Sequence, residues 1–380
     1  MAVAKKWAVG WWCALAVAGM MSTPAAAAPE DDTLAKLAQL RNLPATSAAA
    51  DVQQGRKELD NAWRWLGNNK AAALPVLRRE LAAELKKAQP NQYLLLELGH
   101  FLRVQGTAAD RALSLQALLA LDPVGIVPQT QQDQLFRFVH ASAADRDPRL
   151  FKLMDQVFLR GHVTVFLPQH GYTVDETSVC IYLYGQYGAL AERHLAGLLH
   201  DPQAVHRALE LLMWVGSPDS VPAVAALLNT ADADTFARAT TFLLRAGGPA
   251  GREALGNFDA RGLQGKAREF YLQTRQQLAS MNFDTLVHQL EEAPGGDGNQ
   301  PPRRLDAAAA QAALAALEQN YGSYADVQPA EIATSALPAA QLIDGLIRVR
   351  ERSLLRISGE ALTDIDTTNT LINTLRFRGD

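Results

Sequence analysis

The chain has few cysteines, few aromatic residues and none of the common catalytic motifs. Of its 380 residues, two are cysteines, Cys13 and Cys180, and 7% are aromatic. It contains no Gly-x-Ser-x-Gly nucleophile motif, no helical histidine pair with the spacing of zinc proteases, and no glycine-rich phosphate loop after a strand. These absences argue against serine hydrolases, zinc proteases and nucleotide-binding enzymes. We therefore predict no catalytic residue, no metal and no cofactor.

An excess of basic residues is also missing. Lys and Arg number 36 and Asp and Glu number 40, which gives a formal net charge of −4 at pH 7. Nucleic-acid binding needs concentrated positive charge that neutralises phosphates, so we predict no nucleic-acid partner. Disorder is excluded for most of the chain, because 48% of the residues are hydrophobic. Leucine and alanine dominate that fraction, which favours helices.

The first residues have the pattern of an export signal. Lys5 and Lys6 precede an apolar stretch, Trp7–Met21, and a run of small residues ends at Ala28. The apolar stretch is shorter than the roughly 20 residues that a membrane-spanning helix needs. We predict a cleaved signal peptide at residues 1–27 and a periplasmic or secreted protein with no membrane span after cleavage. A retained membrane anchor is the alternative.

Cleavage at this place removes two positive charges and one cysteine. The net charge changes from −4 to −6, because Lys5 and Lys6 are lost and residues 1–27 contain no acid. Cys180 is then the single cysteine, so no intrachain disulfide can form and stability depends on packing. Cys180 lies among apolar residues, which predicts a buried, unreactive thiol.

Helices of similar length recur along the chain, and each ends near a glycine. The clearest pair has Val205–Val215, then Gly216, a polar turn, and Val221–Leu228 with a proline at its second position. A similar pair follows it, and Gly188, Gly216 and Gly247 are 28 and 31 residues apart. We expect these glycines to take the left-handed conformation of a helix C-cap. The proline is expected in the first turn of its helix.

An earlier segment has the same features. Trp65-Leu66-Gly67 matches Trp214-Val215-Gly216, and Leu74-Pro75-Val76-Leu77 matches Val221-Pro222-Ala223-Val224. This pattern resembles the HEAT-like repeats of bacterial proteins, including the phycobilin-lyase type, over about residues 52–258. The resemblance implies an all-α fold, an α-solenoid of antiparallel helix pairs that share a continuous core and bind through their long exposed surface.

One segment interrupts the helical pattern. Gly161–Asp175 alternates β-branched and other residues around a proline and a glycine, which predicts an extended loop or a small hairpin. Insertions in helical repeats often contain binding residues, and tyrosine is common at binding surfaces. Aromatic residues beside helix ends, however, usually belong to the core. A metal site at the histidines is possible here, but solvated loop residues are favoured. The predicted partner-binding residues are His162, Phe166, His170, Tyr172, Tyr184 and Tyr187.

The composition divides the chain into four parts after the signal. Residues 28–51 form a polar, alanine-rich segment, and residues 52–292 form the repeat domain, with a helix at Phe283–Glu291 as its expected cap. Residues 293–303 form a linker rich in proline and glycine. Residues 304–380 form a small helical C-terminal region, and the sequence leaves open whether it docks on the repeats.

These observations predict an exported scaffold or adaptor that binds a protein or peptide partner. They favour a non-enzymatic protein over an enzyme. Removing the insertion is expected to abolish partner capture and leave helical content and melting unchanged. One alternative is a HEAT-based, lyase-like enzyme or cofactor-handling protein, which requires polar groups that converge near Tyr172, His170 and Cys180. A second alternative is a self-associating structural protein of the cell envelope. The sequence does not identify the partner.

Overall fold

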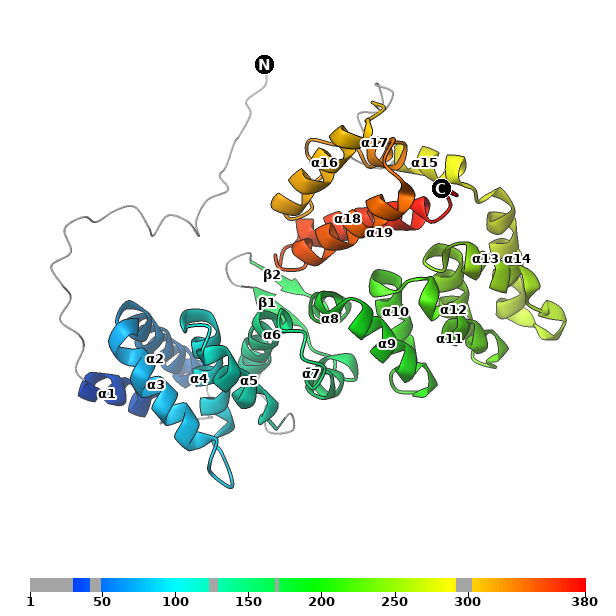
Figure 1. The fold of residues 1–380 in the computed structure, drawn as a ribbon. Helices are drawn as coiled ribbons and strands as arrows, with labels where there is room; N and C mark the ends of the chain where they lie inside the picture. Colours follow the sequence, from blue (N-terminus) through cyan, green and yellow to red (C-terminus); the bar gives the residue numbers. More distant parts are fainter. Residues whose placement is uncertain (1–29, 42–48, 123–128, 168–170, 292–302) are drawn as a thin grey trace, which may run out of the picture.

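The structure, a computed structural model, confirms the all-α class. It describes residues 30–41, 49–122, 129–167, 171–291 and 303–380. Within these residues, the protein consists of helices α1 to α19, short helical turns and one two-stranded sheet (Figure 1). The predicted signal peptide and almost all of the predicted linker lie outside the described residues. None of the described helices combines the length and apolar character needed to span a bilayer.

Helices α1 to α14 form the part of the molecule that we call the helical array. Its helices are α1 (Glu30–Arg41), α2 (Ala49–Asn68), α3 (Lys70–Glu84), α4 (Gln92–Gln105), α5 (Asp110–Leu119), α6 (Gln129–Ala143), α7 (Leu150–Met154), α8 (Glu176–Tyr184), α9 (Ala189–Gly197), α10 (Val205–Val215), α11 (Val221–Ala225), α12 (Ala233–Arg245), α13 (Gly248–Asn257) and α14 (Gly265–Ser280). A π-helical turn follows α7 at Asp155–Leu159. Short 3₁₀ turns lie at Gly185–Tyr187, Leu198–His200, Pro218–Ser220, Ala226–Asn229 and Ala260–Gly262.

Side-chain caps determine where several of these helices begin. Asn91, Asp175 and Asp232 each precede a helix and accept a hydrogen bond from the backbone N–H three residues later. Such caps satisfy N–H groups that have no partner within the helix. Pro222 lies in the first turn of α11, as predicted. Pro75 instead lies inside α3, beyond its first turn, so its match to Pro222 does not extend to helix position.

Close packing explains the glycine at Gly216 better than a left-handed backbone conformation does. Gly188 has a positive φ of 52°, but Gly216 and Gly247 have φ values of −72° and −71°, so the predicted left-handed cap is wrong at these two positions. A Cβ atom on Gly216 would lie 2.4 Å from the Leu212 carbonyl oxygen and 2.7 Å from the Phe242 ring. Glycine therefore allows α12 to approach the end of α10.

Helices of successive pairs lie side by side in the array. α4 contacts α6, α10 contacts both α8 and α12, and α12 contacts α14. In a second row, α3 contacts α5 and α11 contacts α13. One connected cluster of buried side chains extends through these helices from Leu37 to Leu278. The described part of the array therefore has a continuous core, as the helix pattern predicted.

The predicted insertion contains a small antiparallel hairpin. Strand β1 (Val165–Leu167) pairs with β2 (Tyr172–Val174), and Phe166 lies opposite Thr173. Phe166 lies on the free edge of β1, where its N–H donates to Asp133 of α6 and its carbonyl oxygen accepts from Arg137 of α6. These side chains occupy backbone groups that an edge strand otherwise offers to another strand.

Helices α15 to α19 form what we call the C-terminal unit. They are α15 (Phe283–Glu291), α16 (Ala307–Gln319), α17 (Pro329–Ala333), α18 (Ala339–Ser353) and α19 (Gly359–Leu375). Their buried side chains form a second core cluster, and Val287 and Leu290 of α15 belong to it. The prediction that Phe283–Glu291 caps the repeats is therefore wrong, because its apolar stripe packs against α17 and α19.

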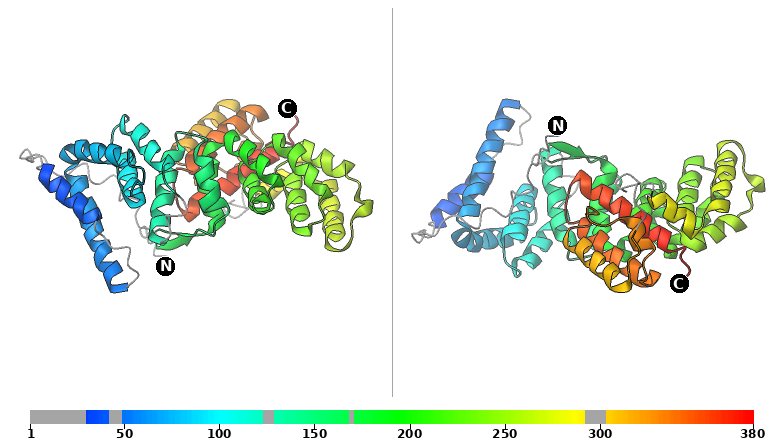
Figure 2. Two further views of the ribbon diagram at one scale, coloured as in Figure 1. Left: turned by 90° about the horizontal axis from the view of Figure 1, so that it is seen from below. Right: turned by 90° about the horizontal axis from the view of Figure 1, so that it is seen from above.

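The C-terminal unit folds back onto the helical array (Figures 1 and 2). Arg350 of α18 donates to the Trp214 carbonyl oxygen at the end of α10. Arg376, just after α19, donates to the Ala246 carbonyl oxygen at the end of α12. The carbonyls at a helix C-terminus lack partners and carry partial negative charge, so arginine side chains stabilise both helix ends.

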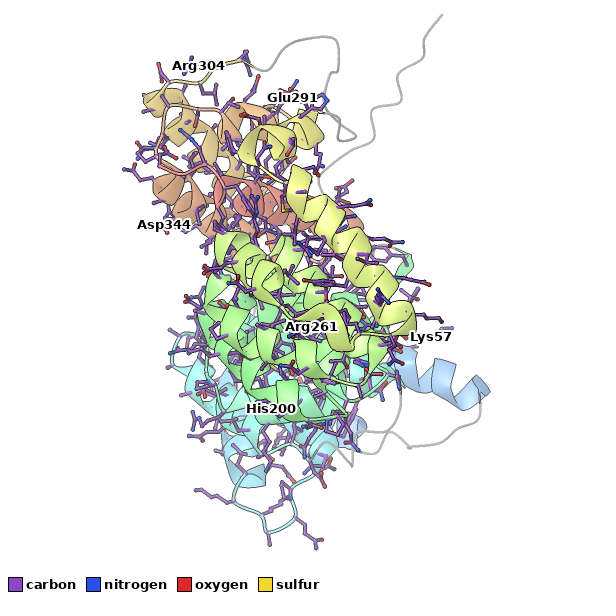
Figure 3. The ribbon with its side chains drawn as sticks, turned by 90° about the vertical axis from the view of Figure 1, so that its right-hand side faces the viewer. Lys57, His200, Arg261, Glu291, Arg304 and Asp344 are labelled. Carbon is purple, nitrogen blue, oxygen red and sulfur yellow. The ribbon has the colours of Figure 1, made fainter. Side chains whose placement is uncertain are left out.

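Further contacts at α6 and α8 extend this docking. The Tyr182 hydroxyl donates to the Ser358 carbonyl oxygen at 2.7 Å, and the Ser358 N–H donates back to it at 3.2 Å. The His140 ring nitrogen Nε2 lies 2.9 Å from the carbonyl oxygen of Leu354, whose side chain is part of the array core. Helix α14 provides the covalent connection and rises from the array near Arg261 towards α15, which ends at Glu291 (Figure 3).

Candidate functional site

The hairpin presents only some of the predicted partner-binding residues to solvent. The His162 side chain is 85% exposed, and its Nδ1 atom lies 2.9 Å from the Glu176 carboxylate. Phe166 is 45% exposed, which is unusual for a large apolar side chain in this protein. Tyr172 is half-buried at the other strand, and His170 lies outside the described residues. Of these predicted residues, His162 and Phe166 are therefore exposed and Tyr172 is half-buried.

Tyr184 and Tyr187 belong to the core, which corrects their predicted role at the surface. They are 0% and 1% exposed, and both rings pack against Phe151 of α7. The Tyr184 hydroxyl donates to the buried Asp155 carboxylate at 2.6 Å, and His194 Nε2 lies 3.0 Å from the same carboxylate. Both tyrosines hold α7, α8 and α9 together and do not reach a partner on the surface.

Cys180 is also buried, as the sequence predicted. Its thiol is 0% exposed and Sγ lies 3.4 Å from the Phe158 carbonyl oxygen. Burial raises the pKa of the Cys180 thiol to about 12, because the thiolate loses its hydration. The lyase-like alternative requires the thiol to lie with Tyr172 in an accessible site. The buried thiol does not meet this requirement.

A chain of ion pairs crosses α8, α10 and α12 beside the hairpin. Arg207 of α10 contacts Glu176 of α8 at 2.9 Å, and Glu210 of α10 contacts Arg238 of α12. Hydrogen bonds from His162 and Arg207 lower the pKa of Glu176, so it stays ionised. These charges therefore pair with one another across the three helices.

A concave feature of the described structure lies where the array meets the C-terminal unit. It is a cleft of about 800 Å³ between the end of α12, the last turn of α14, helix α15 and the last part of α19. Its lining residues are Leu244, Arg245, Gln277, Ser280, Met281, Asp284, Thr285, Leu286, His288, Gln289, Thr370, Asn373, Thr374 and Phe377. This volume lies within the range of about 300–1,000 Å³ that is typical of ligand sites.

Local sequence signals explain how α14 and α15 form two walls of the cleft. Only Tyr271, Thr274 and Leu278 of α14 are buried, so this helix packs on α12 by one narrow stripe and leaves its other sides exposed. Asn282 then ends the connection, because its side-chain oxygen accepts from the Thr285 N–H at 3.0 Å and caps α15. The chain turns there and enters the C-terminal unit.

Several polar side chains of the cleft have no hydrogen-bond or ion-pair partner among the described residues. Among the described residues, no hydrogen bond or ion pair involves the side chains of five cleft residues, which are Arg245, Gln277, Asp284, Gln289 and Thr370. They come from α12, α14, α15 and α19. Polar side chains in folded proteins usually have partners in the protein or in water. Five such groups around one cleft are therefore available to a ligand.

The wall formed by α19 is anchored by a half-buried arginine, Arg376. Arg376 donates to the Asn373 side-chain oxygen at 2.8 Å as well as to the Ala246 carbonyl oxygen, and Asn373 lines the cleft. Burial and, to a smaller extent, the nearby positive charge of Arg350 lower the pKa of Arg376 to about 10. Arg376 remains protonated at neutral pH, so it holds Asn373 and the end of α12 together.

No pattern in the sequence marks the cleft residues as a site. They come from three segments, 244–245, 277–289 and 370–377, which only the fold brings together. The one sequence signal that could have pointed to this region is the length and polarity of α14, which differs from the more apolar helices before it. Within the described residues, no group of three or more histidine, cysteine, aspartate or glutamate side chains has a metal-binding arrangement.

No protein-family model, curated protein or solved structure matches this chain. The resemblance to HEAT-like repeats over residues 52–258 therefore stays a prediction from the sequence pattern, and the site has to be interpreted from its own geometry and chemistry.

Proposed function

We propose that this chain is an exported scaffold or adaptor, built on a HEAT-like solenoid, which binds a protein or peptide partner and performs no chemistry on it. The cleft between the helical array and the C-terminal unit is the proposed binding site. The observation that supports this function is the set of five uncommitted polar side chains around about 800 Å³ of space. The periplasm or the extracellular medium is the proposed location, on the basis of the N-terminal pattern.

The site suits binding because its walls are already in place. Each wall is a helix that packs on one of the two cores, and Arg376 ties the wall formed by α19 to the end of α12. A preordered site lowers the conformational entropy that binding has to overcome. The exposed residues of the insertion, His162 and Phe166, are proposed as a second contact for the same partner.

A pair of adjacent substitutions tests the proposed site. Ser280 lines the cleft at the end of α14, whereas its neighbour Ala279 is exposed and does not line it. Ser280→Trp is expected to fill part of the cleft and abolish partner capture by the mature chain from an envelope fraction. Ala279→Trp introduces the same side chain on the same helix and is expected to leave capture intact.

Equal capture by the two variants, with equal far-ultraviolet circular dichroism, would show that the cleft is not the binding site. Measurement of molecular mass over a range of protein concentrations separates an adaptor from a self-associating envelope protein. The adaptor is expected to keep one mass, whereas self-association shifts the mass with concentration.

A further inference from the structure

The cleft contains one positive and one negative side chain that do not pair with each other. Arg245 ends α12 in the helical array, and Asp284 lies at the start of α15 in the C-terminal unit. Both are exposed, and neither forms an ion pair with any described residue. Opposite charges on separate walls favour a ligand with a negative and a positive group at two separated points.

The carboxamide groups of the cleft match the polar groups of a peptide main chain. Gln277 of α14 and Gln289 of α15 each offer an acceptor oxygen and two N–H donors, and neither has a partner among the described residues. An extended polypeptide presents unpaired N–H and C=O groups that must be satisfied when it is bound. Thr370 of α19 adds a hydroxyl that donates or accepts on the opposite wall.

Apolar side chains lie in the same cleft. Leu244, Met281, Leu286 and Phe377 contribute apolar surface from all four walls. Leu244 is buried and the other three are partly buried, so they form a small apolar area beside the polar groups. Methionine adapts its shape to different partners. The cleft therefore has a place for an apolar side chain as well as for two charged ones.

We infer that the cleft binds an extended polypeptide segment in which an acidic and a basic side chain flank an apolar one. The acidic side chain contacts Arg245, the basic side chain contacts Asp284, and the main chain bonds to Gln277 and Gln289. A nucleic acid or polyphosphate does not fit, because Arg245 is the one cation without a partner among the described cleft residues. This inference rests on the proposed function and names the chemistry of the partner at the same cleft.

Selection from a peptide library tests the inference on the full mature chain. The probe is a library of random nonapeptides with acetylated N-termini and amidated C-termini, so that all charge comes from side chains. We expect the wild-type chain to enrich peptides with one acidic and one basic side chain at a fixed separation and order. The double variant Arg245→Glu/Asp284→Lys is expected to enrich the opposite order and to bind the wild-type selections on the order of tenfold more weakly.

A matched control reverses two exposed charges outside the cleft. Arg268 of α14 and Asp366 of α19 do not line it, and Arg268→Glu/Asp366→Lys is expected to select the same peptides as the wild type. Enrichment without a charge pattern, no enrichment at all, or an unchanged order in the Arg245→Glu/Asp284→Lys variant would overturn the inference. If Ser280→Trp still abolishes capture of the native partner in that case, the proposed function stands and only the peptide chemistry fails.

Discussion

At the scale of single residues, a polar cluster inside the N-terminal half of the array has unusual charge states. Glu97 of α4 is 6% exposed and His100 lies one turn further along the same helix. Gln134 of α6 connects them, because its Nε2 atom lies 3.4 Å from the Glu97 carboxyl and 2.7 Å from His100 Nδ1. Burial raises the pKa of Glu97 to about 8 and lowers the pKa of His100 to about 4. Both side chains are therefore mainly uncharged at neutral pH.

The raised pKa of Glu97 predicts that stability falls as the pH rises. An unfolded glutamate ionises near pH 4.3, so between that pH and about 8 the folded state holds a proton that the unfolded state has lost. The resulting loss is at most about 1.4 kcal/mol per pH unit. His100 contributes in the opposite direction, because between about pH 6.5 and 4 the unfolded imidazole binds a proton that the folded, neutral imidazole does not, so stability falls as the pH falls through this range. Above pH 6.5, the effect of Glu97 therefore dominates this cluster.

Glu97→Gln mimics the protonated carboxyl and removes its titration. We expect the free energy of unfolding of the variant, measured with urea, to decline less between pH 6.5 and 8 than that of the wild type. Parallel pH dependence of the two proteins over this interval would show that the Glu97 carboxyl titrates at its ordinary pKa.

At the scale of elements, close approach of helices and strands explains features that composition alone leaves ambiguous. Val165, Leu167 and Val174 of the hairpin are 0%, 1% and 3% exposed and belong to the array core. Removal of the whole insertion therefore exposes part of this core and lowers the melting temperature. The expectation that melting stays unchanged without the insertion does not fit this packing, whereas substitution of the exposed Phe166 leaves the core intact.

Two glycines provide a matched test of why glycine recurs in the helix pairs. At Gly216 a Cβ atom meets the Leu212 carbonyl oxygen and the Phe242 ring, whereas at Gly67, inside α2, it meets nothing within 4 Å. Gly216→Ala is expected to destabilise the protein by about 1–3 kcal/mol through overpacking. Gly67→Ala is expected to stabilise it by about 0.5–1 kcal/mol, because alanine favours helix. The midpoints of urea unfolding of the two variants and the wild type measure both effects, provided that the m-value is the same in all three proteins.

Loss of stability at both positions would point to a shared backbone requirement for glycine and would contradict the packing explanation. Gain at both positions would show that α12 has room to move away from the end of α10.

At the scale of the whole molecule, two arginines, Arg350 and Arg376, help to hold the two cores together. Arg350 is 7% exposed, and among the described residues its hydrogen-bond acceptors are the Trp214 carbonyl oxygen and the Asn369 side chain rather than a carboxylate. Burial lowers the pKa of Arg350, but the carbonyl ends of helices favour a cation. Arg376 acts in the same way at the end of α12. These directional bonds to helix ends add to the apolar contacts of Leu354 and Ile365, whose side chains belong to the array core.

Replacement of one arginine tests this docking. Arg376→Met keeps the apolar stem but leaves the Ala246 carbonyl oxygen without this donor, at a cost of about 1–3 kcal/mol. We expect faster amide hydrogen exchange in α19 and at the ends of α10 and α12, because the C-terminal unit separates more often from the array.

Arg378→Met is the control for this experiment. Arg378 donates to the carbonyl oxygens of Ala333 and Leu337, which both lie within the C-terminal unit. Its replacement is expected to speed exchange inside that unit and to leave the ends of α10 and α12 protected. The same exchange pattern in both variants would argue that Arg376 stabilises its own unit rather than the docking.

The sequence was sufficient for features that depend on neighbouring residues. The helical class and the buried Cys180 follow from local periodicity and composition, and the continuous core follows from the resemblance to stacked helix pairs. The cleft could not be predicted, because its residues are polar, exposed and distant in sequence, and no periodic pattern connects Arg245 with Asn373. The surface role of Tyr184 was wrong for a related reason, since a tyrosine near a helix end has the same sequence pattern whether it faces solvent or the core.

The connection through Arg376 has a consequence for the shape of an acceptable partner. Helices α12, α14, α15 and α19 line the cleft. The bond between Arg376 and the Ala246 carbonyl oxygen connects α19 to the end of α12, so these helices are joined on all sides of the cleft. This bond resists separation of α19 from α12 at one side of the cleft. A cleft of about 800 Å³ holds a short segment of a partner, such as a terminus or a loop, and not a whole folded domain.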